Sequence, residues 1–481
     1  MGRLRSRNGP AAPLPDPSHE TGPLAPPRGG GAGAAAGAPG ASLGEALAWL
    51  DRHVNLEAIE AGRGGRHGLP TIERISAVMD AIGDPQRSYP VVHVTGTNGK
   101  GSTSRMVAAL LEALGLRVGV YTSPHLEVIN ERMSIGRTAI SDDELVAQLG
   151  ALAELELFLG ERLSWFEIMT ACAYRWFADE AVEAAVVEVG LGGRFDATNV
   201  ADGAVAVVTN VALDHTELLG PTRESIAGEK AGIVKPGSVL VLGEEDRGIS
   251  RIFDEEAVKV AAQAVWHRGE DFGAEDGRLA LGGRVVDLFT PARRYEDVFV
   301  PLHGAHQQDN AAAALAAAQA FTGAPLAEEV VERGFAAVTV PGRMEVLRRS
   351  PLVVLDGAHN TAGAAAAGVA LAEDFAGAGK VFVVMGCLRG RDPSELLQAL
   401  SAGGRALDRV VACAPASPRA VPAAEVAAAA RGLGAPAEEV EGPSSVAEAV
   451  GRALALAGPA DLVLVTGSLY VVGAARTALR R

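Results

Sequence analysis

A glycine-rich segment holds the residues with the clearest chemical potential. The stretch VTGTNGKGSTS (94–104) follows a β-branched run and precedes a helical pattern, so its backbone N–H groups can face one concavity. Lys100 supplies positive charge for phosphate oxygens, and a following hydroxyl can reach a magnesium ion. The spacing differs from the standard phosphate-binding loop because only two residues separate Gly96 and Gly99. The segment predicts a phosphate-binding turn; a glycine-rich turn that only packs tightly is the alternative. The predicted contacts are Thr97, Asn98, Gly99, Lys100, Gly101 and Ser102.

Two other segments place ionisable side chains after apolar runs. Glu188 lies at the end of the run 184–189, and Asp214 and His215 follow the run 204–209. Because ligands of parallel α/β sheets gather beyond the carboxyl ends of the strands, these side chains should border the phosphate turn. A carboxylate, an imidazole, a hydroxyl and phosphate oxygens suit magnesium better than zinc. The structural alternative is a carboxylate that caps a loop and a buried imidazole.

A repeating order of strand, loop and helix must position these groups. The first series predicts strands over 91–95, 118–122, 184–189 and 204–209, and a helix over 165–178. The second series predicts strands over 351–356, 380–386, 408–413 and 461–467, with Ala-rich helices between them. This alternation indicates an α/β fold with a mainly parallel, doubly wound sheet and a smaller second α/β domain.

The order of segments also predicts the domain limits. Residues 1–42 are dominated by Pro, Gly and Ala and are expected to form a disordered tail. Ser42 can cap a helix that carries Leu43 and Leu50 on its apolar face. The loop through Pro341 separates the two series, so we expect a first domain over 43–342 and a second over 343–481.

Composition excludes several classes of function. The 481 residues include 43 Lys and Arg against 59 Asp and Glu, a formal net charge of −16 that disfavours binding to nucleic acid or anionic membrane. No run reaches about 18 uninterrupted apolar residues, so no membrane span is expected. The three cysteines are far apart in the sequence, which predicts neither disulfides nor a cysteine metal site and favours the cytoplasm. A monomer is expected.

The segment GTNGKGS (96–102) resembles the ATP loop of the Mur ligase superfamily, and within it that of folylpolyglutamate synthase/dihydrofolate synthase. The likeness runs through almost the whole chain after residue 43. It implies a Mur-ligase-like P-loop ATPase domain over 43–342 and a Rossmann-like glutamate-ligase domain over 343–481. It also implies ATP and two magnesium ions as cofactors.

The resemblance assigns further roles. Ser123 of YTSPHL (121–126), Glu188 and His215 fall on magnesium positions. Lys230 of EKAGI lies in the last turn of a helix expected from Pro221 to Gly232, where a positive charge interacts favourably with the helix dipole. The resemblance implies a different role, because the family carries this lysine as a carbamate. Such an anion could hold a second magnesium. Four residues match ATP contacts, with Arg343 reaching phosphate across an interdomain cleft that must close. They are Asn310, Arg343, Asp356 and His359.

Three segments match the family's acceptor contacts. HGLP (67–70), SWFE (164–167) and FDA (195–197) comprise His67, Gly68, Leu69, Pro70, Ser164, Trp165, Phe166, Glu167, Phe195, Asp196 and Ala197. Trp165 and Phe166 could stack on an aromatic ring, although both also fit the apolar stripe of their helix. The segment MGCLRGRDP (385–393) departs from the family's Lys-Asp version, so Arg389 and Arg391 receive no role. VTGSLYVVG (465–473) matches a terminal signature and is expected to form a strand and a turn.

The implied activity is ATP-dependent amide ligation. A carboxylate of dihydropteroate or a reduced folate would take the γ-phosphate of ATP, and the amine of L-glutamate would displace phosphate from the acyl phosphate. Lys100, Lys230 and His215 would act in catalysis, and one chain could serve both acceptors. The alternatives are a peptidoglycan-type Mur ligase and a P-loop ATP-binding module without ligase chemistry.

Overall fold

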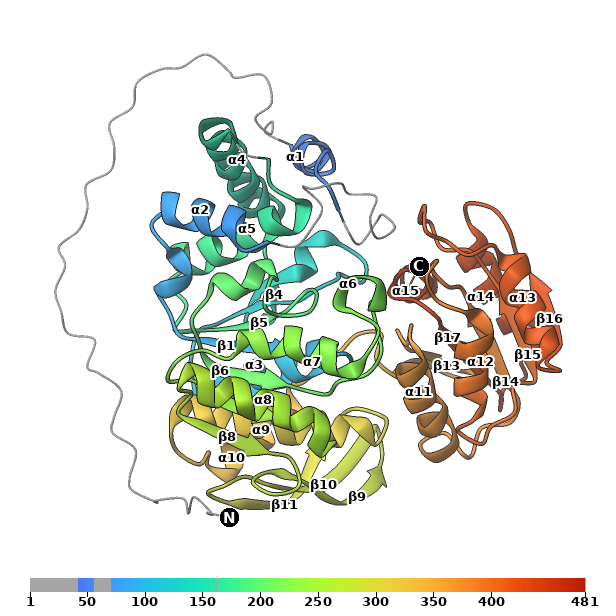
Figure 1. Ribbon diagram of the computed structural model, residues 1–481. Coiled ribbons are helices and arrows are strands. Elements are labelled where there is room, and N and C mark those ends of the chain that lie inside the picture. The colour runs from blue at the N-terminus through green and yellow to red at the C-terminus, as the bar shows by residue number, and fades with distance from the viewer. Residues whose placement is uncertain (1–41, 56–70, 161, 481) are drawn as a thin grey trace.

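The computed structural model describes residues 42–55, 71–160 and 162–480, and Figure 1 shows two α/β bodies joined through residues near 342. The predicted tail, apart from Ser42, and the expected acceptor segment 67–70 lie outside the described residues. Ser42 caps the first helix by accepting the N–H of Glu45, as its position predicts. No helix in the described part of the chain combines the length and apolar character needed to cross a membrane.

An eight-stranded sheet forms the centre of the first body within the described residues. Its order is β4-β3-β2-β5-β1-β6-β7-β8, and the six strands from β2 to β8 in this order are parallel. The central β1 is buried along its whole length because helices cover both faces of the sheet. This confirms the mainly parallel, doubly wound sheet. The strands are β1 (Val91–Thr95), β2 (Val118–Tyr121), β3 (Met133–Ile135), β4 (Thr138–Ala139), β5 (Ala184–Glu188), β6 (Gly203–Val208), β7 (Val239–Leu242) and β8 (Ala264–His267).

The helices of this body form one layer on each face of the sheet. One layer contains α1 (Leu43–Leu50), α2 (Glu73–Ala81), α4 (Asp142–Leu159), α5 (Trp165–Asp179), α7 (Arg223–Lys230) and α8 (Arg247–Val260). The opposite layer contains α3 (Lys100–Ala113), α9 (His306–Thr322) and α10 (Glu328–Ala336). Shorter helices are α6 (Thr216–Leu219), η2 (Pro85–Arg87), η3 (Ile129–Arg132), η4 (Ala197–Val200) and η5 (Ala231–Ile233).

A three-stranded antiparallel sheet packs on the second layer, and the sequence patterns did not predict it. It consists of β9 (Gly273–Ala280), β10 (Gly283–Phe289) and β11 (Arg294–Val300). Its inward side chains, among them Val286, Leu288 and Val298, join α3, α9 and α10 in one hydrophobic core. The alternation of buried and exposed residues along β11 is typical of a sheet with one solvated face.

The second body is built on a six-stranded sheet in the order β12-β13-β17-β14-β15-β16, parallel except for β12. This confirms a smaller α/β sheet domain. Its strands are β12 (Glu345–Arg349), β13 (Leu352–Leu355), β14 (Val381–Met385), β15 (Arg409–Ala412), β16 (Ala437–Glu439) and β17 (Leu462–Thr466). Its helices are α11 (Thr361–Glu373), α12 (Pro393–Ser401), α13 (Ala423–Gly432), α14 (Ser445–Leu456) and α15 (Leu469–Arg480).

The expectation of a strand and a turn over 465–473 is wrong in its second half. The chain leaves β17 at Thr466 and enters helix α15 at Leu469. Ser468 accepts the N–H of Val471 at 3.2 Å, and Val471, Val472 and Ala475 are buried against the sheet. Tertiary burial of this helical face therefore overrides the strand preference of the apolar residues.

The packing of Phe177 makes a stability prediction. Its ring fills the space beside Gly119, where a Cβ would lie 2.7 Å from the Phe177 ring, and it is fully buried. We expect Phe177→Ala to lower the free energy of unfolding by about 3–5 kcal/mol because it leaves a cavity in the core. Phe158 is 85% exposed, so Phe158→Ala should cost less than about 0.5 kcal/mol. Denaturant unfolding of both variants measures the difference; equal effects would contradict this packing.

Candidate functional site

The phosphate turn between β1 and α3 has a conformation that only glycine supports. Gly96 and Gly99 have φ of 149° and 84°. A Cβ on Gly96 would lie 1.8 Å from the Thr209 hydroxyl, and one on Gly99 would lie 2.4 Å from Oδ1 of Asn310. The backbone thus approaches its neighbours too closely for any larger residue. Lys100 Nζ donates to the carbonyl of Gly96 at 3.2 Å, which keeps the ammonium group over the turn.

The segment after β6 holds this turn in place. The N–H of Thr97 donates to the Asn210 carbonyl at 3.0 Å, and the N–H of Asn98 donates to Asn210 Oδ1 at 3.1 Å. The Thr209 hydroxyl donates to the Asn98 carbonyl at 2.6 Å. Sequence reasoning did not assign Thr209 or Asn210, although both lie at the end of a predicted strand, where ligands are expected.

A cavity of about 510 Å³ lies over the turn, and both domains line it. The first domain contributes the phosphate turn and the start of α9, and the second contributes the segment around Arg343, the loop after β13 and α11. The structure therefore brings all the predicted nucleotide and metal residues to one cavity. They are Thr97, Asn98, Gly99, Lys100, Gly101, Ser102, Ser123, Glu188, His215, Lys230, Asn310, Arg343, Asp356 and His359.

The second domain's part of this cavity depends on Asp356, at the end of β13. Its carboxylate accepts the N–H of Met344 at 3.0 Å and that of Ala358 at 2.9 Å. The carboxylate thereby fixes the backbone beside Arg343 and the loop that leads to His359. The structure gives Asp356 an ordering role in addition to its place in the cavity wall.

Glu188 and His215 carry donor atoms of the kind that could hold a divalent cation. Glu188 is buried at the end of β5, accepts the N–H of Ser123 at 3.2 Å, and has a pKa that burial raises against the opposing effect of Lys100. Burial lowers the pKa of His215 to about 4, so its imidazole is neutral at pH 7 and can donate a lone pair. In the described part of the chain no cluster of three or more His, Cys, Asp or Glu side chains could hold a metal. The donor set therefore fits a cation that also takes hydroxyl and phosphate oxygens.

Lys230 lies buried beneath the phosphate turn, at the last residue of α7. Its Nζ donates to the Gly96 carbonyl at 2.8 Å. Burial, and then the charge of Lys100, lower the pKa of Lys230 to about 7. A substantial fraction of the amine is consequently neutral near pH 7, which an exposed lysine would not provide.

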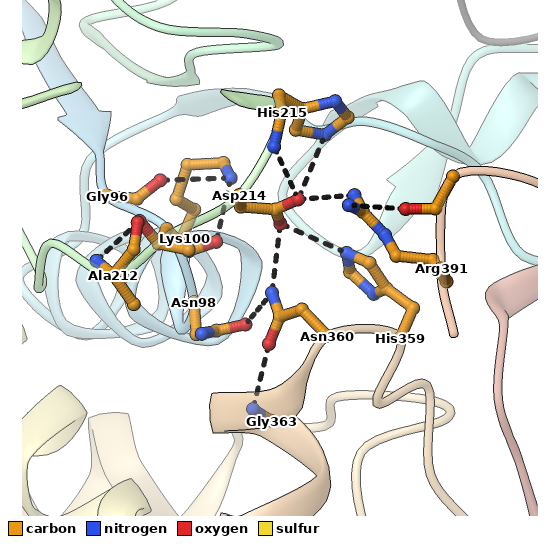
Figure 2. Close-up of polar contacts among 12 residues, drawn as sticks. Gly96, Asn98, Lys100, Ala212, Asp214, His215, His359, Asn360, Gly363 and Arg391 are labelled. Carbon is orange, nitrogen blue, oxygen red and sulfur yellow. Dashed lines mark hydrogen bonds and ion pairs between the residues drawn. The ribbon is translucent and has the colours of Figure 1, made fainter. Parts of the chain in front are cut away.

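Asp214 is the centre of the contacts between the two domains (Figure 2). Asn360 Nδ2, from the second domain, donates to Asp214 Oδ2 at 2.9 Å and to Asn98 Oδ1 at 3.0 Å. The Arg391 guanidinium pairs with the same carboxylate, and His359 Nε2 lies 3.8 Å from it. Burial would raise the pKa of Asp214, but the neighbouring histidines and Arg391 hold it well below its usual range.

Asn360 and Arg391 are site residues that sequence reasoning missed. Asn360 completes the segment LDGAHN and caps α11 by accepting the N–H of Gly363 at 2.8 Å, so its position before a helix was an available signal. No local pattern distinguishes Arg391 from Arg389. The fold separates them, because Arg391 reaches Asp214 whereas Arg389 is exposed.

A second cavity, of about 240 Å³, adjoins the first and contains most of the predicted acceptor residues. Ser164, Phe166, Glu167, Phe195, Asp196 and Ala197 line it. Several of these residues also order the backbone. Ser164 and Glu167 form a capping box at the start of α5, Glu167 pairs with Arg74 at 3.1 Å, and Asp196 caps η4. Arg391 and Arg419 add positive charge at the second-domain end of this cavity.

Trp165 does not line this cavity, so its predicted contact with an acceptor is corrected. The indole is buried in the core, with the Arg132 guanidinium 4.6 Å from its ring centroid and its Nε1 donating to Asp51 at 3.4 Å. Trp165 points about 100° away from Phe166 around the helix axis and toward the core formed with Ile168, Met169 and Cys172. Phe166 therefore faces the cavity, and Trp165 packs in the hydrophobic core.

Comparisons with known proteins agree on one family. The model of the Mur ligase middle domain matches residues 167–318, and that of the Mur ligase, glutamate ligase domain matches residues 342–469. A dihydrofolate synthase/folylpolyglutamate synthase of Mycobacterium tuberculosis is 39% identical over 446 residues, covering 86% of this chain and 90% of the relative.

Solved structures give the same result. The Mycobacterium tuberculosis folylpolyglutamate synthase complexed with ADP superposes with a TM-score of 0.83 at 39% identity, covering 92% of this chain and 99% of the other. The bifunctional folylpolyglutamate synthase/dihydrofolate synthase of Yersinia pestis, complexed with AMPPNP and a Mn ion, has a TM-score of 0.78 at 32% identity, covering 92% and 98%. By sequence and by fold, this chain belongs to the dihydrofolate synthase/folylpolyglutamate synthase family of Mur ligases.

Proposed function

We propose that the chain is an ATP-dependent ligase that joins L-glutamate to dihydropteroate and to the γ-carboxylate of reduced folates. The observation that carries this proposal is the junction of the two cavities. Ser123, His215 and His359 line both cavities, so a nucleotide γ-phosphate in one cavity would meet an acceptor carboxylate from the other. Holding two anions in this geometry is the main requirement for forming an acyl phosphate.

The proposed reaction has two displacements. A carboxylate oxygen of the acceptor attacks the γ-phosphorus, the bond to the bridging oxygen breaks, and ADP leaves. The glutamate amine then attacks the acyl carbonyl to form the carbon–nitrogen bond. The bond between the acyl carbon and the phosphate oxygen breaks, inorganic phosphate leaves with the electron pair, and the nitrogen releases a proton. Lys100 and Arg343 face the same cavity from the two domains, where they stabilise the charge that develops on the transferred phosphoryl group.

Ser123, Glu188 and His215 are the residues that would hold a magnesium ion, and a carbamate on Lys230 would provide an anionic ligand for a second one. When bound, the ions neutralise phosphate charge. The residues of the chain itself bind and orient the phosphates through the turn N–H groups, while closure of the two domains around Asp214 excludes water from the acyl phosphate.

Phosphate release from Mg·ATP tests the proposal, with L-glutamate present and dihydropteroate or tetrahydrofolate supplied separately. We expect turnover only when glutamate and a folate acceptor are both present, and the two rates give the balance of activities. Turnover with a UDP-linked peptide acceptor instead would identify a peptidoglycan-type ligase. ATP binding without any acceptor-dependent turnover would identify a nucleotide-binding module and refute ligation.

A cytosolic monomer remains our proposal for the working form of the enzyme. The three cysteines, all of which are free and buried, support a reducing compartment. Light scattering of the purified full-length chain measures the oligomeric state, and a mass of about twice the monomer's would overturn the monomer.

The two arginines of the loop after β14 supply a matched test of the interdomain contact. We expect Arg391→Ala to lower kcat/KM for the ligation about 10- to 100-fold, because it leaves the buried Asp214 carboxylate with less compensating charge. Arg389→Ala should stay within about twofold of the wild type because that side chain is exposed. Steady-state phosphate release measures both variants, and equal losses would contradict a specific role for Arg391.

A further inference from the structure

An ion cluster joins the two domains at a place outside both cavities, with its Arg284 and Asp374 side chains buried and its Glu373 side chain about half exposed. Arg284, on β10 of the three-stranded sheet, donates to Glu373 Oε2 at 2.6 Å and pairs with the carboxylate of Asp374. Glu373 is the last residue of α11, and Asp374 caps the C-terminal end of that helix. The Arg284 side chain is 6% exposed and that of Asp374 is 0% exposed, so this contact is part of the domain interface and not a solvated surface pair.

Helix α11 connects this cluster to the reaction cleft. Its 13 residues span about 20 Å at 1.5 Å per residue. Asn360 caps the other end and bonds to Asn98 of the phosphate turn and to Asp214. Between the two ends, Gly363 and Ala367 form part of the wall of the nucleotide cavity. The first domain therefore holds α11 at both ends, and Figure 1 shows this helix on the side of the second domain that faces the first.

Asp374 also holds the segment that begins α9, the opposite wall of the same cavity. Its Oδ2 accepts the N–H of Gly304 at 2.8 Å and lies 3.3 Å from Nδ1 of His303. Gly304 has a φ of 97°, and a Cβ there would lie 2.5 Å from the His306 ring, so the backbone at this point is closely constrained. His306 and Asn310 follow within the first turns of α9 and line the nucleotide cavity.

The carboxylate of Asp374 is charged in this arrangement. Burial opposes ionisation, but hydrogen bonds from His303, Arg284 and the Gly304 N–H lower the pKa of Asp374 to about 2. Removing the guanidinium leaves a buried anion without its main counter-charge, which favours separation of the two walls so that water can reach it.

We propose that Arg284 and Asp374 are positioning residues for the nucleotide: they fix the far end of α11 against the start of α9 and so set the spacing of the two walls of the cavity. The inference rests on the nucleotide site of the proposed function and extends it to residues that do not touch the nucleotide. No described residue of β9, β10 or β11 lines either cavity. Through Arg284, the three-stranded sheet would nevertheless help to position the nucleotide.

Calorimetric titration of the full-length chain with ADP tests this inference directly. We expect Arg284→Ala and Asp374→Asn each to weaken ADP binding about tenfold, equivalent to about 1.4 kcal/mol. In turnover, KM for ATP should rise by a similar factor while KM for the folate acceptor and for glutamate stays within about twofold. Arg284→Lys keeps the charge and should recover binding to within about threefold of the wild type.

The matched control is Arg294→Ala on the neighbouring strand. Arg294 pairs with Glu275 and Asp287 inside the three-stranded sheet, and within the described residues it forms no hydrogen bond or ion pair with the second domain. Its loss should therefore leave ADP binding unchanged. ADP binding within twofold of the wild type in Arg284→Ala and Asp374→Asn, or an equal loss in Arg294→Ala, would overturn the proposal. If Arg284→Ala does not fold, Asp374→Asn alone decides the result by the same criterion, with Arg294→Ala as its control. ADP binding needs no turnover, so a failure of the ligase assignment is distinguishable from a failure of this inference.

Discussion

Replacing Lys230 by Ala or by Arg is expected to lower kcat about 10³-fold. Lys230 is buried under the phosphate turn, and its position suits a carbamate formed by carbon dioxide on its neutral amine. Neither replacement can form that anion, and Arg adds a permanent charge where an anion is proposed. Phosphate release measures kcat, and ¹³C NMR of enzyme in ¹³C-bicarbonate reports the carbamate.

The pH dependence separates Lys230 from its neighbour His215. Burial lowers the pKa of Lys230 to about 7, and only the neutral amine reacts, so carbamylation and activity should increase as pH rises through about 7. Added bicarbonate should raise activity on this acid limb. The pKa of His215 is lowered to about 4, so an acid limb near pH 4 would assign the titration to the imidazole and contradict the carbamate.

A control for Lys230 is available five residues further along the chain. Lys235 is partly buried, and its Nζ donates to the Asn199 carbonyl at 3.0 Å, away from the phosphate turn. Lys235→Ala should retain kcat within about threefold of the wild type. If Lys230→Ala retained more than about a tenth of the wild-type activity, Lys230 would have no essential part in the reaction.

Replacing Glu188 by Gln is expected to raise the magnesium concentration for half-maximal activity at least about tenfold and to lower kcat/KM about 10²- to 10³-fold. Gln keeps the shape of the side chain and its contact with Ser123 but removes the charge that a hard cation requires. Magnesium titrations of activity measure the first effect. Binding of Mn²⁺ with ADP, followed by electron paramagnetic resonance, measures the loss of affinity without turnover.

Glu183 supplies the control because it lies just before the other end of the same strand. Its carboxylate accepts the N–H of Arg117 at 2.8 Å and is exposed, far along β5 from the phosphate turn. Glu183→Gln should leave the magnesium dependence unchanged. A wild-type magnesium response in Glu188→Gln would instead limit Glu188 to ordering the backbone of Ser123 and its loop.

Local sequence patterns predicted the elements that carry the site. The apolar runs at 91–95 and 184–189 form the central parallel strands. A strand covered by helices on both faces buries every side chain, so most of its residues are apolar. Because these strands are parallel, the phosphate turn and the polar residues that follow β5 and β6 all lie at the same edge of the sheet. The exception was Leu469–Arg480, whose β-branched residues form a helix because one helical face is buried.

The sequence by itself determined the phosphate turn and the two series of strands, because each depends on residues close together in the chain. Only the tertiary structure decided which distant groups meet. Asn360 and Arg391 reach Asp214 across 146 and 177 positions, Trp165 packs in the core, and Arg284 pairs with Asp374 across 90 positions. Such contacts depend on how two separately folded sheets dock, and that docking is set by surface shape and charge, which no local periodicity encodes.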